Sequence, residues 1–276
     1  MITCDLKGGL GNQLFQIFTV IAYSLKNKIK FILPDSLKSN YRNTYWDSLL
    51  LNLKFFTKEY SSINLSNCIK YNEQGFHYNE IPYINNNIEL RGYFQSYKYF
   101  DDHFFDIIKF IKLNSIIENT KVKYLHYFEN DTISMHFRLG DYKKLQDVHP
   151  ILEYEYYEKS LENIINNTKK DNYNILYFFE KDDVDDINLI INKLKNKFTT
   201  LNFTSIDTTI TDWEQMLLMS LCNHNIIANS SFSWWGSYIG YKLNENKIVC
   251  YPSIWFGPTL SNNNISDLFL DKWNKI

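Results

Sequence analysis

Apolar and polar positions repeat with two different periods along the chain, and each change of period predicts a helix or a strand. Ile133 to Phe137 carries apolar side chains at every second position, as a strand does, whereas Leu14 to Leu25 repeats them every three to four positions, as a helix does. Strands are expected at 2–6, 30–33, 88–94, 133–137, 173–179, 199–203, 225–228 and 247–251, and helices at 12–26, 96–111, 153–166, 184–197, 213–222 and 231–241. Alternating strands and helices of these lengths indicate an α/β fold with parallel sheets covered on both faces.

The length of the chain favours two domains. With 276 residues the sequence is long for one ordinary domain. The strand–helix alternation is clear at the start and again from about residue 132, and residues 36–80 between show no clear periodicity. We therefore expect an N-terminal domain at 1–128 and a C-terminal domain at 129–276, with a cleft between them.

Composition excludes several classes of protein. The net charge of −2 is spread along the chain without a basic stripe, so no nucleic-acid partner is expected. The four cysteines are far apart and lack metal-ligand spacing, which is typical of buried thiols in a reduced compartment. The sequence contains no run of about 18 apolar residues, so no transmembrane segment is expected. The first residues predict a strand, and we expect no signal peptide. A cytoplasmic location is expected, and the oligomeric state stays open.

A cluster of polar residues stands at the end of the strand at 133–137. His136, Arg138 and Asp141 follow one another there. Open α/β sheets bind ligands at the carboxyl ends of their strands, and arginine holds phosphate or carboxylate groups through two parallel bonds. Arg138 is therefore a candidate anion ligand.

The segment Asn229 to Gly236 follows a short strand and opens a helix. The first turn of a helix leaves backbone N–H groups unpaired and carries positive partial charge, so it suits a phosphate group. Ser230, Ser231 and Ser233 would add donors. The alternative is that these residues only cap the helix while Trp234 and Trp235 fill the core.

A glycine-rich turn separates the first strand from the first helix. Gly9 and Gly11 fit the first two glycines of a dinucleotide-binding loop, and Asp35 ends the next strand. The third glycine position is occupied by Leu14. This pattern leaves an NAD-dependent oxidoreductase as an alternative.

An acidic stretch, Glu180 to Asp186, ends another predicted strand. Asp183 and Asp185 form a DxD pattern, which holds a divalent ion in some sugar transferases. Asp185 and Asp186 also suit the first turn of the next helix. A third possibility is that Glu180, Asp182 or Asp183 accepts hydrogen bonds from a guanine base.

Several segments, in this order, resemble the α-1,2-fucosyltransferases, and the likeness covers nearly the whole chain. The matching motifs are Gly8–Gln16, Gly92–Ser96, His136–Tyr142, Leu218–Gly236 and Tyr251–Phe256. One departure is Leu139, which replaces the second arginine of the family's motif. Neighbouring side chains on a strand point to opposite faces, so Leu139 need not disturb Arg138.

The resemblance implies a GT-B-like fold, two Rossmann-like domains that face each other across a cleft. It implies GDP-fucose as donor, inversion at the anomeric carbon, no metal and no further cofactor. The donor would bind mainly in the C-terminal half, and the N-terminal half, with Gly9, Asn12 and Gln13, would face the acceptor and the cleft. The residues expected to bind are His136, Arg138, Asp182, Asn229, Ser230, Ser231, Ser233, Gly9 and Asn12.

The expected reaction is attack of a glycan hydroxyl, such as O2 of a galactoside, on the anomeric carbon of the donor. Arg138 and the serine-lined helix N-terminus would stabilise charge on the leaving diphosphate. His136 and Asp141 are the other catalytic candidates, with Asp141 either the general base or a group that orients Arg138. Alternatives are another GDP-deoxysugar such as GDP-rhamnose, or a glycan-binding protein with an inactive donor site.

Overall fold

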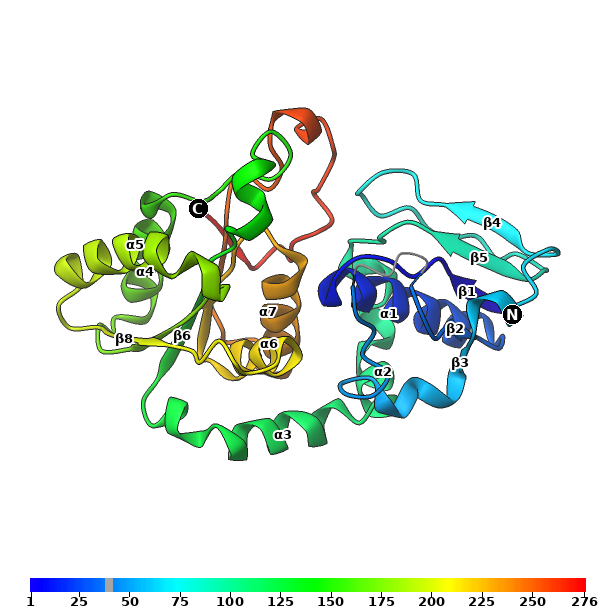
Figure 1. Ribbon diagram of the computed structural model, residues 1–276, viewed down its shortest axis with the longest axis horizontal. Coiled ribbons are helices and arrows are strands. Elements are labelled where there is room, and N and C mark those ends of the chain that lie inside the picture. The colour runs from blue at the N-terminus through cyan, green and yellow to red at the C-terminus, as the bar shows by residue number, and fades with distance from the viewer. Residues whose placement is uncertain (38–41) are drawn as a thin grey trace. The chain divides into compact units, whose positions relative to one another are not determined.

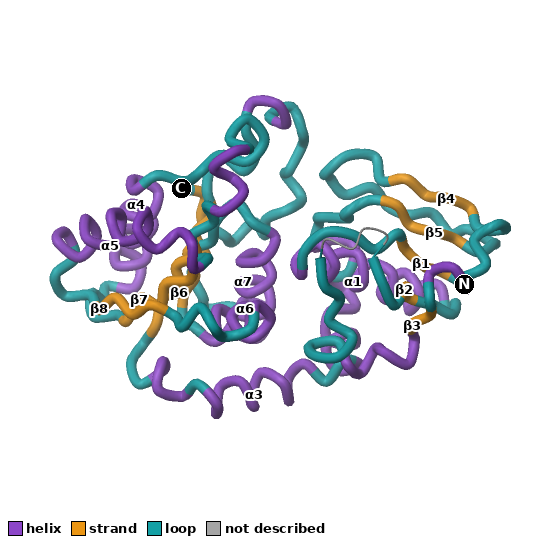
Figure 2. The backbone as a smooth tube through the Cα atoms, in the orientation of Figure 1, coloured by secondary structure: helices purple, strands orange, loops and turns teal. Residues whose placement is uncertain are grey.

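The computed structural model describes residues 1–37 and 42–276, and they form two compact units. Unit 1 comprises residues 1–116 with 263–271, and unit 2 comprises 117–262 with 272–276. The sequence-based boundary after residue 128 therefore lies within unit 2. Both units contain parallel strands and helices, so the expected α/β class is confirmed (Figures 1 and 2). Of the described residues, no helix combines the length and apolar character needed to cross a membrane.

Unit 1 is built on a three-stranded parallel sheet in the order β1-β5-β4, with a separate parallel pair of β2 and β3. Its elements in chain order are β1 (Ile2–Cys4), α1 (Leu10–Asn27), β2 (Leu33–Pro34), the 3₁₀ helix η1 (Leu51–Phe56), β3 (Thr57–Lys58), β4 (Ile69–Asn72), β5 (Ile88–Arg91) and α2 (Phe104–Phe110), after which α3 (Leu113–Lys123) leads into unit 2.

Residues 263–271 return to unit 1 after most of unit 2 has been built. The Asp267 carboxylate accepts a hydrogen bond from the Tyr78 backbone N–H at 3.0 Å and pairs with Lys98. The Asp267 carbonyl accepts a bond from the Ser96 hydroxyl at 2.7 Å. This late segment is thus an integral part of the first unit.

The predicted helix over 96–111 is wrong in its first half. Two 3₁₀ turns, Tyr97–Tyr99 and Asp101–His103, stand there instead, and α2 begins only at Phe104. Phe100 between the turns has a φ of −142°, outside the helical range. Its ring is buried against two phenylalanines of α1, so packing on α1 outweighs local helix preference.

Unit 2 contains a six-stranded, fully parallel sheet in the order β11-β10-β9-β6-β7-β8. Its elements are β6 (Thr132–His136), α4 (Tyr154–Thr168), β7 (Asn174–Phe178), α5 (Val184–Lys197), β8 (Asn202–Ser205), α6 (Asp212–Leu221), β9 (His224–Ile226), α7 (Ser231–Leu243), β10 (Val249–Tyr251) and β11 (Asn274–Lys275).

The order of the strands reverses between β6 and β9. From β6 the chain adds β7 and β8 on one side, then crosses to β9 on the other side and continues to β10 and β11. Such a reversal is the topological switch point of a doubly wound sheet, and ligands bind in the crevice at the carboxyl ends of the two strands that flank it. The fold alone therefore directs attention to the segments that follow β6 and β9.

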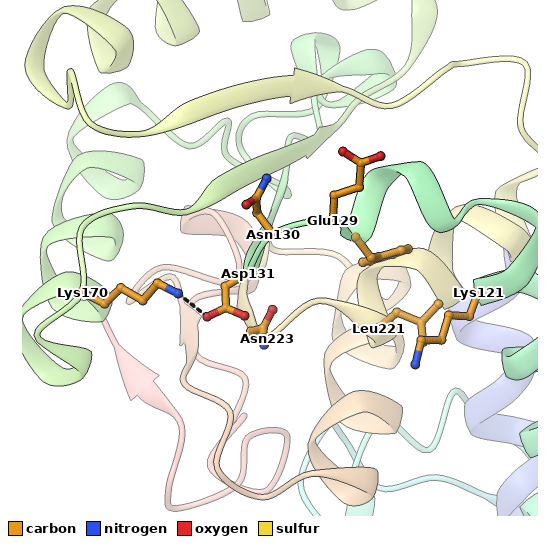
Figure 3. Close-up of a pocket in the computed structure, with 8 residues that line it drawn as sticks. Lys121, Glu129, Asn130, Asp131, Lys170, Leu221 and Asn223 are labelled. Atoms are coloured by element: carbon orange, nitrogen blue, oxygen red, sulfur yellow. Dashed lines mark hydrogen bonds and ion pairs between the residues drawn. The ribbon is translucent and has the colours of Figure 1, made fainter.

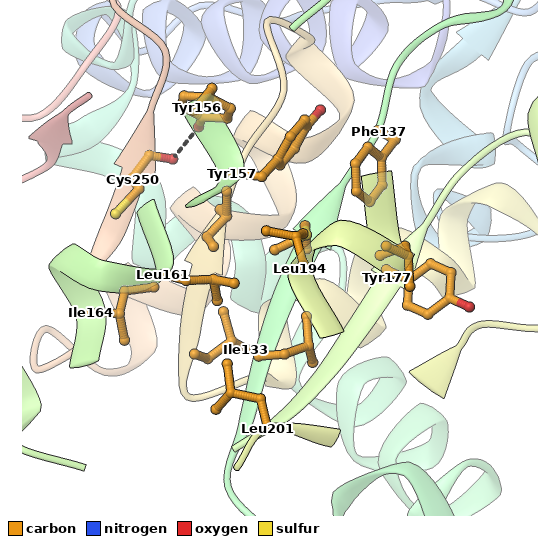
Figure 4. Packing of buried hydrophobic residues seen from close by; sticks show 14 of the residues in the cluster. Ile133, Phe137, Tyr156, Tyr157, Leu161, Ile164, Tyr177, Leu194, Leu201 and Cys250 are labelled. Carbon is orange, nitrogen blue, oxygen red and sulfur yellow. Dashed lines mark hydrogen bonds between the residues drawn. The ribbon is translucent and has the colours of Figure 1, made fainter. Parts of the chain in front are cut away.

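Helices cover the sheet of unit 2 on both faces. Ile133, Ile175 and Tyr177 pack in one buried cluster with α4 and α5 (Figure 4). Leu176 and Phe178, the alternate residues of β7, pack in a second cluster with α6. The apolar run of β7 thus supplies both cores, as expected for a central parallel strand.

Helices α6 and α7 are in unusually close contact because α7 has two glycines. A Cβ atom on Gly236 would lie 2.8 Å from the Met219 Cβ, and one on Gly240 would lie 2.5 Å from the Ser220 carbonyl oxygen. Both approaches are too short for any other residue. This contact fixes the position of α7, whose N-terminus follows β9.

Candidate functional site

Arg138 lies just beyond the carboxyl end of β6, where two carboxylates hold its guanidinium group. One guanidinium nitrogen pairs with Glu180, which follows β7, and another pairs with Asp141. The Arg138 side chain is 16% exposed, whereas those of Asp141 and Glu180 are 49% and 58% exposed. A largely covered cation whose partners are solvated is suited to bind an incoming anion in their place.

A second cation, Lys143, ties the same loop to the start of α5. Its ammonium group lies 2.8 Å from Asp183 and 2.7 Å from Asp186, and these bonds raise the pKa of Lys143. Asp183 is buried and also accepts a bond from the Gly140 backbone N–H at 2.8 Å. Gly140 has a φ of +39°, and a Cβ there would lie 2.7 Å from a Glu180 oxygen. The positive φ favours glycine at this position, and a side chain there would displace the Glu180 carboxylate.

Tyr142 connects the Arg138 loop to the turn before α7. The guanidinium carbon of Arg138 lies 4.9 Å from the centre of the Tyr142 ring, within the range of a cation–π contact. The Tyr142 hydroxyl donates to the Asn229 carbonyl at 3.2 Å. On the Tyr142 ring stacks His149, with centroids 4.6 Å apart. The segments that follow β6 and β9 are thereby joined in one site.

His136 is the last residue of β6 and is only 7% exposed. Burial, assisted by the positive charge of Arg138, lowers its pKa to about 3, so the imidazole is neutral at physiological pH. Its ring lies 5.5 Å from that of Phe232 on the first turn of α7. A neutral imidazole there suits hydrogen bonding to a ligand and does not supply positive charge.

The serine-rich turn divides its polar groups between the fold and the surface. The Ser233 hydroxyl is buried and accepts a bond from the Ala228 backbone N–H at 3.2 Å. Asn229 is also buried, and its amide donates to the Pro150 carbonyl at 2.8 Å. Ser230 caps α7 by accepting from the Phe232 N–H at 3.3 Å. Ser231, the first residue of the helix, is partly exposed.

The structure shows the capping and core role that the sequence suggests for this turn, and anion binding there stays a prediction. Asn229, Ser230 and Ser233 hydrogen-bond within the protein, and Trp234 and Trp235 are fully buried. This internal bonding fixes the first turn of α7. The backbone N–H groups of that turn and the Ser231 hydroxyl are then the groups suited to an anion.

The remaining acidic candidate, Asp182, lies on an exposed 3₁₀ turn before α5. In this stretch Asp183 and Asp186 are engaged with Lys143. The described residues contain no group of three or more His, Cys, Asp or Glu side chains placed to hold a metal ion.

Leu139, the departure from the fucosyltransferase motif, points into the hydrophobic core of unit 2. It is 5% exposed and packs in the cluster that contains α4 and α5. Its neighbour Arg138 instead bonds to the exposed carboxylates. Leu139 and Arg138 therefore have different surroundings, one in the core and the other among exposed carboxylates.

In unit 1 the glycine turn is held by amide side chains. Gln13 is fully buried and donates to the carbonyls of Gly8 at 3.0 Å and Asn43 at 2.8 Å. Gln16 accepts from the Lys7 backbone N–H at 3.1 Å and donates to its carbonyl at 2.8 Å. The two glutamines of the motif therefore fix the shape of the turn.

Gly9 and Asn12, the two site candidates of this turn, differ in their surroundings. The Asn12 side chain accepts a bond from Gln95 at 2.8 Å, which links the turn to the Gly92–Ser96 motif. Gly9 precedes α1 with a φ of −75°, and a Cβ there would meet no atom within 4 Å. The fold of the described residues thus does not require glycine at position 9.

A separate concavity of about 370 Å³ lies at the opposite edge of the unit 2 sheet (Figure 3). Asp131, Lys170 and Asn223 line it, and they precede β6, β7 and β9 respectively. Lys170 pairs with Asp131 there. The concavity thus lies at the amino-terminal ends of the strands. Parallel sheets bind ligands at the carboxyl ends of their strands, where Arg138 lies, so the two places are distinct.

Sequence reasoning did not identify Lys143 or the stacking of His149 on Tyr142, and it did not pair Glu180 with Arg138. Lys143 follows the matching motif by one residue, so its position was a usable signal. The sequence suggests Glu180 only as a partner for a guanine base. Its contact with Arg138 depends on the pairing of β6 with β7, which the sequence does not specify.

The chain is similar to known glycosyltransferases over almost its whole length. The O-antigen biosynthesis glycosyltransferase WbnK of Escherichia coli is 29% identical, with 99% of each chain covered. An alpha-1,2-colitosyltransferase of Escherichia coli is 27% identical, over 100% of this chain and 99% of the relative. A solved structure of Escherichia coli ADP-heptose LPS heptosyltransferase II aligns with a TM-score of 0.36 and 13% identity, over 58% of this chain and 42% of that one. The sequence profile of glycosyl transferase family 11 matches residues 1–275, and the chain belongs to that family.

Proposed function

We propose that this glycosyltransferase moves L-fucose from GDP-fucose to a hydroxyl of an acceptor glycan, with inversion at the anomeric carbon. The acceptor hydroxyl we propose is O2 of a galactoside. The observation that carries the proposal is the placement of Arg138 and the α7 N-terminus after β6 and β9, the two strands of the switch point. Membership of family 11 supports sugar transfer as the reaction.

The proposed chemistry assigns the diphosphate of the donor to Arg138 and the first turn of α7. As the bond between the anomeric carbon and the diphosphate breaks, negative charge grows on the leaving phosphate. The Arg138 guanidinium and the N-terminal end of α7 carry positive charge of the kind that stabilises such a leaving group. The phosphate would replace Glu180 or Asp141 as a partner of Arg138.

Asp141 is proposed to orient Arg138. Its carboxylate contacts the guanidinium directly, which favours a positioning role over that of the general base that removes the proton of the acceptor hydroxyl. His136, being neutral and at the end of β6, is proposed to hydrogen-bond the donor.

We propose that the reaction needs no metal ion, since Arg138 and the helix N-terminus supply positive charge for the diphosphate. Activity unchanged by the chelator EDTA supports this proposal. Loss of activity in EDTA, restored by Mg²⁺ or Mn²⁺, overturns it.

The sugar of the donor has a second candidate. The relative named as an alpha-1,2-colitosyltransferase covers the whole chain at 27% identity, so a colitosyl nucleotide is the alternative to GDP-fucose. GDP-rhamnose is a further GDP-deoxysugar to include.

The test is a donor screen read by mass spectrometry. The purified enzyme is incubated with GDP-fucose, GDP-rhamnose or a colitosyl nucleotide, together with a panel of galactose-terminated glycans. A product heavier by one fucosyl residue, formed only with GDP-fucose, supports the proposal. Transfer only from another donor corrects the sugar, and failure of GDP to bind by calorimetry overturns the proposed donor site.

A further inference from the structure

An exposed aromatic patch on unit 1, remote in sequence from the donor-site residues of unit 2, has no role in the proposed reaction. Phe55 on η1 is 97% exposed, Leu51 on the same 3₁₀ helix is 56% exposed, and Phe110 at the end of α2 is 43% exposed. Exposed apolar groups on neighbouring elements are a feature of interaction surfaces, and η1 is joined to the end of α2. We define the aromatic patch as Phe31, Leu51, Phe55, Phe56 and Phe110.

Three segments far apart in the sequence come together in this patch. The ring of Phe56 lies 4.9 Å from that of Phe31 and 5.1 Å from that of Phe110. The Asn52 side chain donates to the Ile111 carbonyl at 3.1 Å, which fastens η1 to the end of α2. In Figure 1 the light-blue turn that leads into β3 is η1. The rings of Phe31, Phe56 and Phe110 are therefore in mutual contact within one compact unit, and Leu51 and Phe55 belong to the same 3₁₀ helix as Phe56.

Lysines accompany each segment of the patch. Lys30, Lys54 and Lys109 each stand immediately before a phenylalanine of the patch, and Lys58 and Lys112 stand two residues after one. All five are exposed. Lys54 pairs with Asp47. Within two residues of any member of the patch, the sequence contains no acidic residue.

We propose that the aromatic patch and its lysines dock unit 1 on an anionic lipid surface. Phe55 and Leu51 insert at the level of the lipid headgroups, and the lysines contact the lipid phosphates. Long lysine side chains are able to keep their charges at the interface while their stems cover apolar surface. A second copy of the chain fits less well, because a two-fold contact would place the same lysines against one another.

Co-sedimentation with vesicles tests the proposal. The full-length protein is mixed with vesicles of phosphatidylglycerol and phosphatidylcholine, or of phosphatidylcholine alone, at 50 mM and 500 mM NaCl. We expect sedimentation with the anionic vesicles at low salt and release at high salt, since about 0.5 M salt screens charges over a few ångströms.

Three variants distinguish insertion of the aromatic patch into the lipid surface from non-specific adsorption to vesicles. Phe55→Ser should lower the partition coefficient about tenfold, and Lys58→Ala about fivefold. Phe105→Ser is the matched control, because Phe105 is 56% exposed in the same unit but is followed by Asp106; it should bind vesicles as the wild type does. Transfer to a soluble acceptor without vesicles should be equal in all three variants.

Three results overturn the proposal. The first is wild-type protein that stays in the supernatant with anionic vesicles at low salt. The second is an equal loss of vesicle binding in Phe105→Ser and Phe55→Ser. The third is a dimer, seen by sedimentation velocity, that Phe55→Ser converts to monomer, since the patch would then join two copies of the chain. None of these results depends on which sugar the enzyme transfers.

Discussion

The glycine turn of unit 1 and the Arg138 loop of unit 2 both follow the carboxyl end of a parallel strand, but different forces hold them. Buried, neutral amides of Gln13 and Gln16 fix the first. Exposed carboxylates hold the cation of the second. Hydrogen bonds made by buried amide side chains are costly to break, whereas ion pairs with exposed carboxylates contribute little and exchange readily. The turn of unit 1 is therefore fixed in shape, whereas the loop of unit 2 is able to exchange one bound anion for another.

Removing the cation of the exchangeable loop should have the largest effect. Arg138→Ala is expected to lower kcat by about 100- to 1000-fold, or about 2.7–4 kcal/mol of barrier, because the leaving diphosphate loses a charged donor. Transfer is measured by product formation from GDP-fucose, and folding by circular dichroism. Lys144→Ala removes an exposed cation from the 3₁₀ helix Gly140–Lys144, which follows Arg138. This variant should retain activity. Near wild-type turnover in Arg138→Ala would remove Arg138 from the mechanism.

Breaking the amide-held turn should instead affect stability. Gln13→Ala leaves the carbonyls of Gly8 and Asn43 without their donor, which is expected to lower the free energy of unfolding by about 2–3 kcal/mol. Urea denaturation followed by circular dichroism measures the loss. Gln74→Ala, at an exposed glutamine, should change stability by less than about 0.5 kcal/mol. Equal stability of the two variants would contradict the structural role of Gln13.

Acid should destabilise unit 2 through its buried histidines. Burial lowers the pKa of His136 to about 3 and that of His224 to about 4. Below their ordinary pKa of 6.5, the unfolded chain binds protons that the folded unit excludes, so stability falls as the pH drops from about 6.5 toward 4. Each histidine contributes at most about 1.4 kcal/mol per pH unit.

Urea denaturation at pH 7 and pH 5 checks this dependence. His136→Asn should weaken the fall in stability between the two values. The exposed His126, replaced by Asn, serves as the control. An unchanged slope in His136→Asn would show that this imidazole is not excluded from protonation in the folded state.

Weakening the contact between the Arg138 loop and the turn before α7 should have the smallest effect on activity. Tyr142→Phe keeps the ring beside Arg138 but removes the hydroxyl that donates to the Asn229 carbonyl. Loss of one such bond corresponds to about 1 kcal/mol, or about fivefold in kcat/KM. Tyr142→Leu, which removes the ring as well, should lose more activity. Identical kinetics in both variants would separate Tyr142 from the site.

Strongly periodic segments could be predicted from the sequence, and contacts between segments could not. The helix predicted at 184–197 is α5 to the residue, because Ile187, Ile191 and Leu194 repeat at helical spacing toward the core. Residues 36–80 show no clear period in the sequence, and residues 38–41 lie outside the described residues. The elements described in this stretch are 3₁₀ helices, the two-residue β3 and the four-residue β4, which are too short to give a clear periodic signal.

The candidate site was predictable in part for the same reason. Arg138 and the serine turn follow recognisable strands, so their place at strand ends could be derived from the sequence. The pairing of Arg138 with Glu180 depends on which strand lies beside β6. The division of the serine turn into buried and exposed groups depends on the packing of α7 on α6.

The return of residues 263–271 to unit 1 limits how the enzyme can be dissected. The polypeptide passes from one unit to the other after residues 116, 262 and 271. A gene fragment encoding only 1–116 would lack Asp267, and so would lose the partner of Lys98 and of the Tyr78 N–H. No single division of the gene separates the two units, so fragments made in this way are expected to fold poorly. The enzyme should therefore be produced as one continuous polypeptide.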